Sequence, residues 1–590
     1  AALRWSLLFN LAGALFIALG LCVLLIPRLH LNEAARQHWW RGFIGWAGTW
    51  RVIPLVAFVL TYKLGEFAIG PMVKPFWVDY GKSIWPSQED LMFQIGLFPT
   101  SFGIVLSIAG ALAGGAFITR YGIFHAVWFL GLLQAASNMG YSAVDWLSLG
   151  RYGLYGASMF ESFSGGLGTA APAAADDEVV SRGITIPAFY NPPSSLPSAD
   201  GALIRSEPLK LGLSLPGLNG PLPGTATRLM YKSTDSNGQP VAVTGAYIEP
   251  SARWAGTGPR PLVVLAPGTL GQGDQCAASL ALENPLALNL TEGTVSVGYE
   301  NLATYRLLAK GVAVAVTDYV GLGATDRLHT YVNRIDEGHA VLDAVRAARG
   351  LDSASVTDAS PVGLYGYSQG GGATAAAAEL QPSYAPDVTL SGVYSGAPPA
   401  DLVKVLPGID GSALAAAAGW TVNGLAQSEP ALRPIIDAYI NDKGRAALED
   451  VSTRCVGDGI FAYGFTKTRS WTVQGISLGD VVVREPAVQA AVDKQRIGRL
   501  RPTAPVRVAT GVADDTVPHR QARQLAVDWC AKGANVTYEP VYLPNLGNKL
   551  VLPNHFLPML EDQGQAIAWV TDRLAGKPAR SNCRFLPIMP

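Results

Sequence analysis

Pro361-Val362-Gly363-Leu364-Tyr365-Gly366-Tyr367-Ser368-Gln369-Gly370-Gly371-Gly372 joins an apolar run to a cluster of glycines around one serine, and an alanine-rich segment, residues 373–380, follows it. The apolar run predicts a strand, and the alanine-rich segment predicts a helix. Glycines at 366 and 370 leave room for a strained turn that raises the serine hydroxyl above the end of the strand. The stretch therefore predicts a nucleophilic serine at position 368.

On both sides of this stretch, short β-branched runs alternate with helical patterns. Such alternation is typical of a parallel α/β sheet. Several of the runs are almost entirely apolar, as expected of strands that helices cover on both faces. The predicted strands are residues 241–248, 261–266, 312–317, 362–365, 388–394, 506–510 and 536–542.

A serine hydroxyl at its ordinary pKa is a weak nucleophile and needs a histidine base held by a carboxylate. On this kind of strand, turn and helix the acid and base follow the serine in the order Asp, His. The loop after the predicted strand 506–510 contains Asp514 and Asp515, and either could orient the imidazole. His519 is too near this loop to be placed independently, which leaves His555 as the predicted base.

A serine that attacks a carbonyl group also needs N–H donors for the oxyanion that forms. One is expected from the backbone of Gln369, directly after the serine. The second is expected from the loop after an early strand, residues 266–276, where Thr269 and Leu270 are both candidates.

The formal net charge of −1 gives no electrostatic case for nucleic acid, whose binding needs a basic patch. Four of the five cysteines lie in the part of the chain that reads as a soluble protein, and none forms a Cys-x-x-Cys pair. Two disulfides, with three possible connectivities, are therefore predicted instead of a metal site. These four are Cys276, Cys455, Cys530 and Cys583.

The apolar excess of the chain is concentrated before about residue 171. Residues 5–27 contain no charged side chain and are long enough to cross a membrane. Further candidate spans are residues 52–70, 91–119 and 121–144, with a weaker one from Trp146 that Arg151 and Glu161 interrupt. The sequence thus predicts four or five transmembrane helices and an association of the chain with a membrane.

Three runs in this segment, residues 62–66, 131–138 and 161–171, resemble muropeptide-permease-type transporters of the major facilitator superfamily. Such carriers are built from repeated bundles of helices, and five helices supply only part of one. Lys63 and Glu66 could form a substrate pathway or simply pair within the helix bundle. The likeness stops at Ala171, so the segment reads as an incomplete transporter joined to a different protein.

The remainder resembles the secretory lipase family from about residue 184 to Cys583. The matching motifs include residues 267–269, 274–277 and 317–323, the serine turn, residues 514–518, Asn554-His555 and residues 581–583. The resemblance implies an α/β-hydrolase fold with a helical cap, and hydrolysis of triacylglycerols and other carboxylic esters without a metal or cofactor. It also implies a triad of Ser368, Asp514 and His555.

The cap is expected at residues 398–500, with helices near 412–419, 431–440 and 485–494. The other predicted divisions are a membrane segment at 1–171, a lead-in at 172–225, and a hydrolase core at 226–397 and 501–590. A disulfide between Cys276 and Cys455 would tie the cap to the core, and one between Cys530 and Cys583 would pin the tail.

The sequence therefore predicts a secreted or extracytoplasmic lipase or carboxylesterase that acts on ester lipids and forms an acyl-enzyme. The alternative is a transporter fragment, or a membrane-anchored binding protein with an inactive hydrolase fold. The sequence identifies no protein partner.

Overall fold

The computed structural model describes residues 179–214, 222–289, 293–547 and 552–590, together with 76–85, 87–95, 143–166 and scattered positions before residue 142. The chain divides into two compact units, Ala1–Ala173 and Ala174–Pro590.

In the first unit, the described helices include α5 (Gln88–Ile95) and α8 (Gly150–Gly166). The predicted spans at 5–27 and 52–70, with Lys63 and Glu66, lie outside the described residues, as do most of the spans at 91–119 and 121–144. Within the part of the chain that the structure describes, no helix combines the length and the apolar character needed to cross a membrane.

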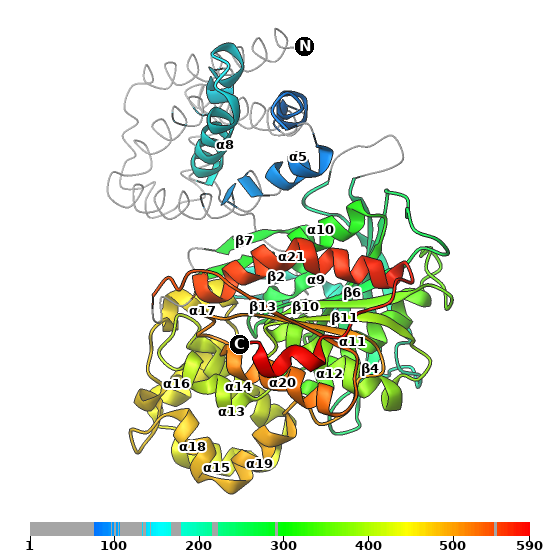
Figure 1. The fold of residues 1–590 in the computed structure, drawn as a ribbon. Helices are drawn as coiled ribbons and strands as arrows, with labels where there is room; N and C mark the ends of the chain where they lie inside the picture. The colour runs from blue at the N-terminus through cyan, green and yellow to red at the C-terminus, as the bar shows by residue number, and fades with distance from the viewer. Residues whose placement is uncertain are drawn as a thin grey trace, which may run out of the picture. The chain divides into compact units, whose positions relative to one another are not determined.

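The second unit is built on a nine-stranded sheet with the order β13-β12-β11-β10-β6-β9-β5-β4-β3 (Figure 1). The six strands from β13 to β9 run parallel, and β5, β4 and β3 add to one side as antiparallel neighbours. The bounds are β3 Leu203–Leu209, β4 Gly224–Thr234, β5 Pro240–Pro250, β6 Leu262–Ala266, β9 Ala313–Val320, β10 Val362–Tyr367, β11 Leu390–Gly396, β12 Val506–Gly511 and β13 Val536–Val541.

Helices cover both faces of the sheet. Since successive side chains of a strand point to opposite faces, a strand can contribute side chains to two buried clusters. In β6, Leu262 and Val264 belong to one buried cluster, whereas Val263 and Leu265 belong to another. The first cluster includes side chains of α11 (Arg334–Arg349), α12 (Gln369–Tyr384) and α20 (His519–Ala531). The second includes side chains of α9 (Ala278–Glu283), α10 (Asn301–Ala309) and α21 (Pro553–Leu574). The predicted sheet, mostly parallel and with helices on both faces, is thus confirmed.

The predicted lead-in at 172–225 needs a correction. It contains the hairpin β1 (Val179–Ser181) and β2 (Ile184–Ile186), and also β3, the edge strand of the main sheet. Strand β3 pairs along its length with β4, which makes it part of the main sheet. A second hairpin, β7 (Leu286–Asn289) and β8 (Thr294–Val297), lies outside the main sheet.

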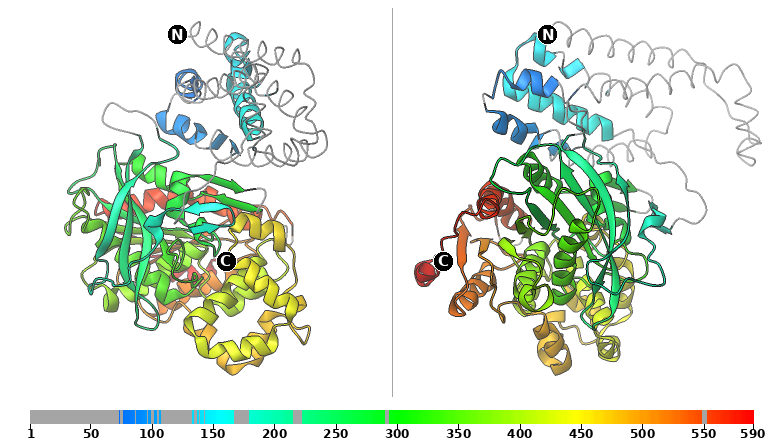
Figure 2. Two further views of the ribbon diagram at one scale, coloured as in Figure 1. Left: turned by 180° about the vertical axis from the view of Figure 1, so that it is seen from behind. Right: turned by 90° about the vertical axis from the view of Figure 1, so that its right-hand side faces the viewer.

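A helical cap occupies the chain between β11 and β12. Its helices are α13 Leu402–Ile409, α14 Ala416–Ser428, α15 Arg433–Tyr439, α16 Asp442–Val451, α17 Val456–Tyr463, α18 Leu478–Arg484 and α19 Pro486–Lys494. Figure 2 shows them gathered in one group, yellow-green to orange. Trp420 and Trp471 are buried in the cap's own hydrophobic core, with Tyr463 packed against it, whereas Phe461 is 68% exposed.

Candidate active site

Ser368 lies at the turn between β10 and α12, with φ 58° and ψ −123°. A non-glycine residue with positive φ is uncommon and is found where the surrounding structure enforces it. A Cβ atom at Gly366 would lie 2.2 Å from the carbonyl oxygen of Gly370, and one at Gly370 would lie 2.0 Å from that of Ala266. The two glycines therefore permit the close packing that holds the serine in its strained conformation.

His555 hydrogen-bonds to two other side chains of the site. Its Nδ1 lies 2.7 Å from Oδ2 of Asp514, and its Nε2 lies 2.9 Å from Oγ of Ser368. The side chains of His555 and Asp514 are almost completely buried. With the Nδ1 proton held by the carboxylate, Nε2 is free to accept the serine proton.

Asp514 and His555 are fixed by their own surroundings. The loop after β12 returns two backbone N–H groups, of Thr516 and Val517, to Oδ1 of Asp514 at 3.1 and 3.0 Å. The Tyr367 hydroxyl donates to the carbonyl oxygen of His555 at 2.8 Å. The two bonds to Oδ1 orient the Asp514 carboxylate so that Oδ2 accepts the hydrogen bond from Nδ1 of His555.

The other candidates from the sequence lie elsewhere. Asp515 accepts a hydrogen bond from Asn554, and His519 lies 3.1 Å from the Tyr538 hydroxyl. His555 lies in the first turn of α21. Pro553 begins this helix, and the first turn tolerates proline because its N–H has no intrahelical partner there.

The loop after β6 lies close to the turn that carries Ser368. Thr269 lines the same cavity as Ser368 and Gln369, and among the described lining residues Leu270 is absent. The Leu270 carbonyl accepts a hydrogen bond from the Val456 N–H of the cap at 2.7 Å. Of the two predicted donors, the arrangement favours Thr269.

Sequence reasoning missed a buried carboxyl behind this loop. Oε1 of Glu300 accepts from the N–H of Gly268 at 2.7 Å, and burial raises the pKa of Glu300 to about 7. The neighbouring Tyr299 hydroxyl donates to the Thr269 carbonyl at 3.1 Å. No local pattern marks these residues, because their role depends on α10 packing against the sheet.

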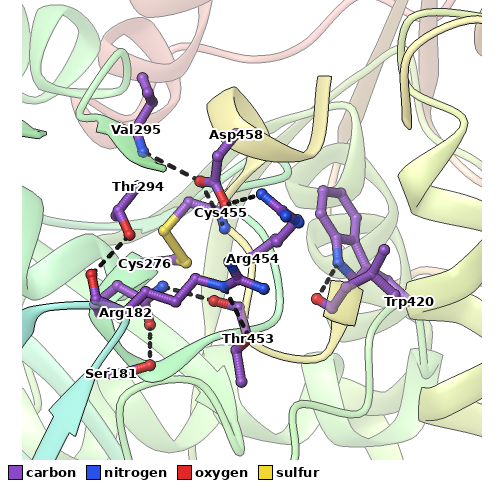
Figure 3. Close-up of a disulfide and its surroundings, with 12 residues drawn as sticks. Ser181, Arg182, Cys276, Thr294, Val295, Trp420, Thr453, Arg454, Cys455 and Asp458 are labelled. Carbon is purple, nitrogen blue, oxygen red and sulfur yellow. Dashed lines mark hydrogen bonds and ion pairs between the residues drawn. A yellow bond between two sulfur atoms is a disulfide. The ribbon is translucent and has the colours of Figure 1, made fainter. Parts of the chain in front are cut away.

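Both disulfides are formed in the pairings hypothesised from the sequence, Cys276 with Cys455 and Cys530 with Cys583. The first joins the loop after β6 to the start of α17 in the cap, where the Gln272 N–H also donates to the Arg454 carbonyl at 2.9 Å. Figure 3 shows Arg182 of the β1–β2 hairpin alongside this disulfide, where its Nε donates to Thr453 at 2.8 Å. The disulfide and the hydrogen bond thus join the loop after β6, which contains the candidate oxyanion donors, to the cap.

A cavity of about 40 Å³ is lined by Ser368 and mainly by apolar cap residues. A second, almost wholly apolar cavity of about 50 Å³ lies among helices α13, α14, α15, α18 and α19. The two cavities share Leu402, Leu406, Ala418 and Thr421. They therefore adjoin.

A mostly parallel sheet, a serine on a strand-to-helix turn, and an aspartate and histidine that follow in this order define an α/β-hydrolase. The family model described as secretory lipase matches residues 285–582. A probable inactive lipase of Mycobacterium tuberculosis is 30% identical over 400 residues, which cover 66% of this chain and 82% of that protein. The chain belongs to the secretory lipase family.

A secreted triacylglycerol lipase of Malassezia globosa is 25% identical over 403 residues, which cover 67% of this chain and 83% of that protein. Among solved structures, lipase A of Candida antarctica is similar with a TM-score of 0.56 and 21% identity, covering 67% of this chain and 87% of that one. The rice cell wall degrading esterase LipA of Xanthomonas oryzae has a TM-score of 0.53 and 18% identity, covering 64% of this chain and 100% of that one. These structures share the fold.

Proposed function

We propose that the protein hydrolyses carboxylic esters, including triacylglycerols, through an acyl-enzyme formed on Ser368. The observation that carries the proposal is the pair of hydrogen bonds on His555, one to Asp514 and one to Ser368. The names of its relatives agree with it, since the family is that of secretory lipases and one relative is a secreted triacylglycerol lipase.

In the proposed reaction, Nε2 of His555 takes the proton of Ser368 as Oγ attacks the ester carbonyl. The carbonyl oxygen becomes an oxyanion, which the backbone N–H groups of Gln369 and Thr269 stabilise. His555 then gives its proton to the departing alcohol, and Asp514 holds the imidazolium in place. Water, deprotonated by the same histidine, attacks the acyl-enzyme and releases the carboxylic acid and the free serine.

The apolar lining of the two adjoining cavities favours a fatty acyl group as the acid part of the substrate. The cavity at Ser368 has polar groups near the serine and becomes apolar toward Leu402 and Leu406. The second cavity continues in apolar surroundings between cap helices. A hydrocarbon chain is stabilised in such a site in proportion to the apolar area that it removes from water.

The proposed location of the hydrolase unit is outside the cytoplasm. Two disulfides are typical of an oxidising compartment, and the Malassezia relative is a secreted protein. Membrane association through residues 1–171, and their origin as a transporter fragment, stay predictions from the sequence.

The test uses the purified chain, its Ser368→Ala variant and p-nitrophenyl esters from butyrate to palmitate. We expect the wild type to hydrolyse these esters and the variant to lose at least about 10⁴-fold in kcat, because removal of a triad member leaves only binding and the oxyanion hole. Ser368→Ala that retained wild-type kcat would refute the mechanism.

The second candidate function is that of an inactive hydrolase fold, and it arises from the Mycobacterium relative with the name probable inactive lipase. A fluorophosphonate probe separates the two, since only an activated serine reacts with it. We expect labelling at Ser368 in the wild type and none in Ser368→Ala. An unlabelled, folded wild type would favour the inactive candidate.

A further inference from the structure

A short segment between β9 and α11, residues 329–332, contacts both sides of the candidate oxyanion site. The Tyr331 hydroxyl lies 2.8 Å from Oγ1 of Thr269, and Nε2 of His329 lies 3.1 Å from Nε2 of Gln369. Nε2 of Gln272 also donates to the His329 carbonyl at 2.9 Å. The segment therefore spans the gap between the loop after β6 and the turn that carries Ser368.

Glu337, in the first turn of α11, fixes the far end of this segment. Its Oε1 accepts hydrogen bonds from Nε2 of Gln369 at 2.8 Å and from the backbone N–H of Val332 at 3.0 Å. Val332 has a φ of 56°, which is a steric outlier for a β-branched residue. Such a conformation persists only where its surroundings hold it, and the bond to Glu337 is one such restraint.

The hydrogens on His329 and Gln369 have only one consistent arrangement. Nδ1 of His329 lies 2.9 Å from the Val320 carbonyl, which can only accept, so Nδ1 carries the proton and Nε2 accepts from Gln369. Burial lowers the pKa of His329 to about 4, which keeps the ring neutral near pH 7. The Gln369 amide thus donates one hydrogen to His329 and the other to Glu337.

All the partners are buried. Gln369 is 2% exposed, Glu337 3% and His329 fully buried. If the Gln369 amide turned over, its oxygen would face two acceptors, Nε2 of His329 and Oε1 of Glu337, in a buried site, which is costly. The side chain of the residue that follows the nucleophile is therefore held in a single orientation, and its backbone N–H is held with it.

We propose that Glu337, His329 and Tyr331 are positioning residues that fix the two oxyanion donors, the N–H groups of Gln369 and Thr269, at a constant separation. This inference rests on the proposed ester hydrolysis. An oxyanion site stabilises the transition state because its donors are already oriented, and loss of one donor costs about 10² to 10³ in kcat. None of the three residues hydrogen-bonds to the Ser368 hydroxyl or to the His555 ring, and Tyr331 lines the cavity next to Ser368.

The test compares four variants of the full chain. Glu337→Ala removes the accepting oxygen, whereas Glu337→Gln keeps one in its place. Tyr331→Phe removes only the hydroxyl that contacts Thr269. Asp343→Ala is the matched control, because this buried carboxylate lies on the same helix α11 but accepts from Ser233 and Tyr384, away from the serine.

Two quantities are measured for each variant after circular dichroism has shown that it is folded. These are kcat and KM on p-nitrophenyl butyrate, and the inhibition constant of butylboronic acid, whose tetrahedral adduct with the serine mimics the transition state. We expect Glu337→Ala and Tyr331→Phe to lower kcat about 10-fold or more with KM nearly unchanged, and to weaken boronate binding by a similar factor. Glu337→Gln and Asp343→Ala should keep kcat within about 3-fold of the wild type when their kcat is measured on the same substrate.

If Glu337→Ala does not fold, Tyr331→Phe still tests the proposal. The inference is overturned if Tyr331→Phe keeps wild-type kcat, or if Glu337→Gln or Asp343→Ala loses as much kcat as the Glu337→Ala or Tyr331→Phe variants. Unchanged boronate binding beside a reduced kcat also overturns it. A folded wild type that hydrolyses no ester refutes the proposed function itself, and the positioning role with it.

Discussion

Asp514 and Asp515 are neighbours in the chain, yet their carboxylates meet different partners. Asp514 faces the imidazole of His555, whereas Asp515 accepts from the side-chain amide of Asn554. The difference comes from the loop after β12, whose N–H groups from Thr516 and Val517 turn the Asp514 carboxylate toward the histidine. We therefore expect Asp514 to be needed for catalysis and Asp515 not to be needed.

We expect Asp514→Asn to lower kcat by about 10⁴, because the amide would stabilise the wrong histidine tautomer. Asp515→Asn is the matched control and should retain kcat within about 3-fold, since its amide oxygen can still accept from Asn554. Both rates are measured on p-nitrophenyl butyrate. Equal losses in the two variants would contradict the assignment of the acid.

The sequence allowed Ser368, His555 and the pair of aspartates to be predicted, because each follows a strand end and the chain order is fixed by the fold. It could not separate Asp514 from Asp515 on position alone. It also gave no signal for Glu337 or His329, whose contacts with Gln369 join residues more than 30 positions apart. Contacts of that kind depend on the packing of α11 against α12 and β9.

Glu337 also makes stability depend on pH. Burial raises its pKa from about 4.5 to about 8. The folded state thus holds this proton more tightly than the unfolded state, so its contribution to stability is complete below pH 4.5 and is lost as pH rises toward 8. We expect the wild type to lose thermal stability relative to Glu337→Gln between pH 5 and pH 8. Melting curves at the two pH values measure this, and a constant difference in Tm would contradict it.

At the scale of elements, the loop after β6 depends on the cap for its position. The backbone of Gln272 and Leu270 pairs with Arg454 and Val456, and the Cys276–Cys455 disulfide closes the same junction. The other disulfide, Cys530–Cys583, joins α20 to the segment after α21, away from Ser368. The two bridges are therefore expected to differ in their effect on catalysis.

We expect the double substitution of Cys276 and Cys455 by serine to lower both Tm and kcat, because the oxyanion loop loses a covalent restraint. The same substitution of Cys530 and Cys583 should lower Tm and leave kcat within about 2-fold. Removal of a native disulfide typically costs about 2–5 kcal/mol of stability. Thermal melts and kcat on p-nitrophenyl butyrate measure the two effects, and a similar kcat in both variants would contradict the distinction.

All six parallel strands could be predicted, since helices cover them on both faces and several of their sequences are continuous apolar runs. Strand β3 was missed because it is an edge strand, and its sequence, residues 203–209, mixes charged and apolar side chains. Its place in the sheet comes from pairing with β4, a long-range contact that no local pattern reports.

At the scale of the whole molecule, the chain divides between Ala173 and Ala174. Every side chain assigned to the site, and both disulfides, belong to the second unit. We expect a fragment that begins at Ala174 to fold and to hydrolyse p-nitrophenyl butyrate with a kcat within about 2-fold of the full chain, as compact units with their own cores can fold alone. An inactive but folded fragment would show that the first unit contributes to catalysis.

The cap enters and leaves the sheet at two adjacent parallel strands, β11 and β12, and the N–H of Ala397 bonds to the Ala509 carbonyl where they separate. A single continuous segment, residues 397–505, thus carries the whole cap, while the serine, aspartate and histidine lie outside it. We expect a change in that segment to alter which substrates are accepted, and to leave the chemistry intact only where the contacts of the cap with the loop after β6 are kept. Evolution or design could therefore exchange caps as modules, provided that a cysteine is kept opposite Cys276.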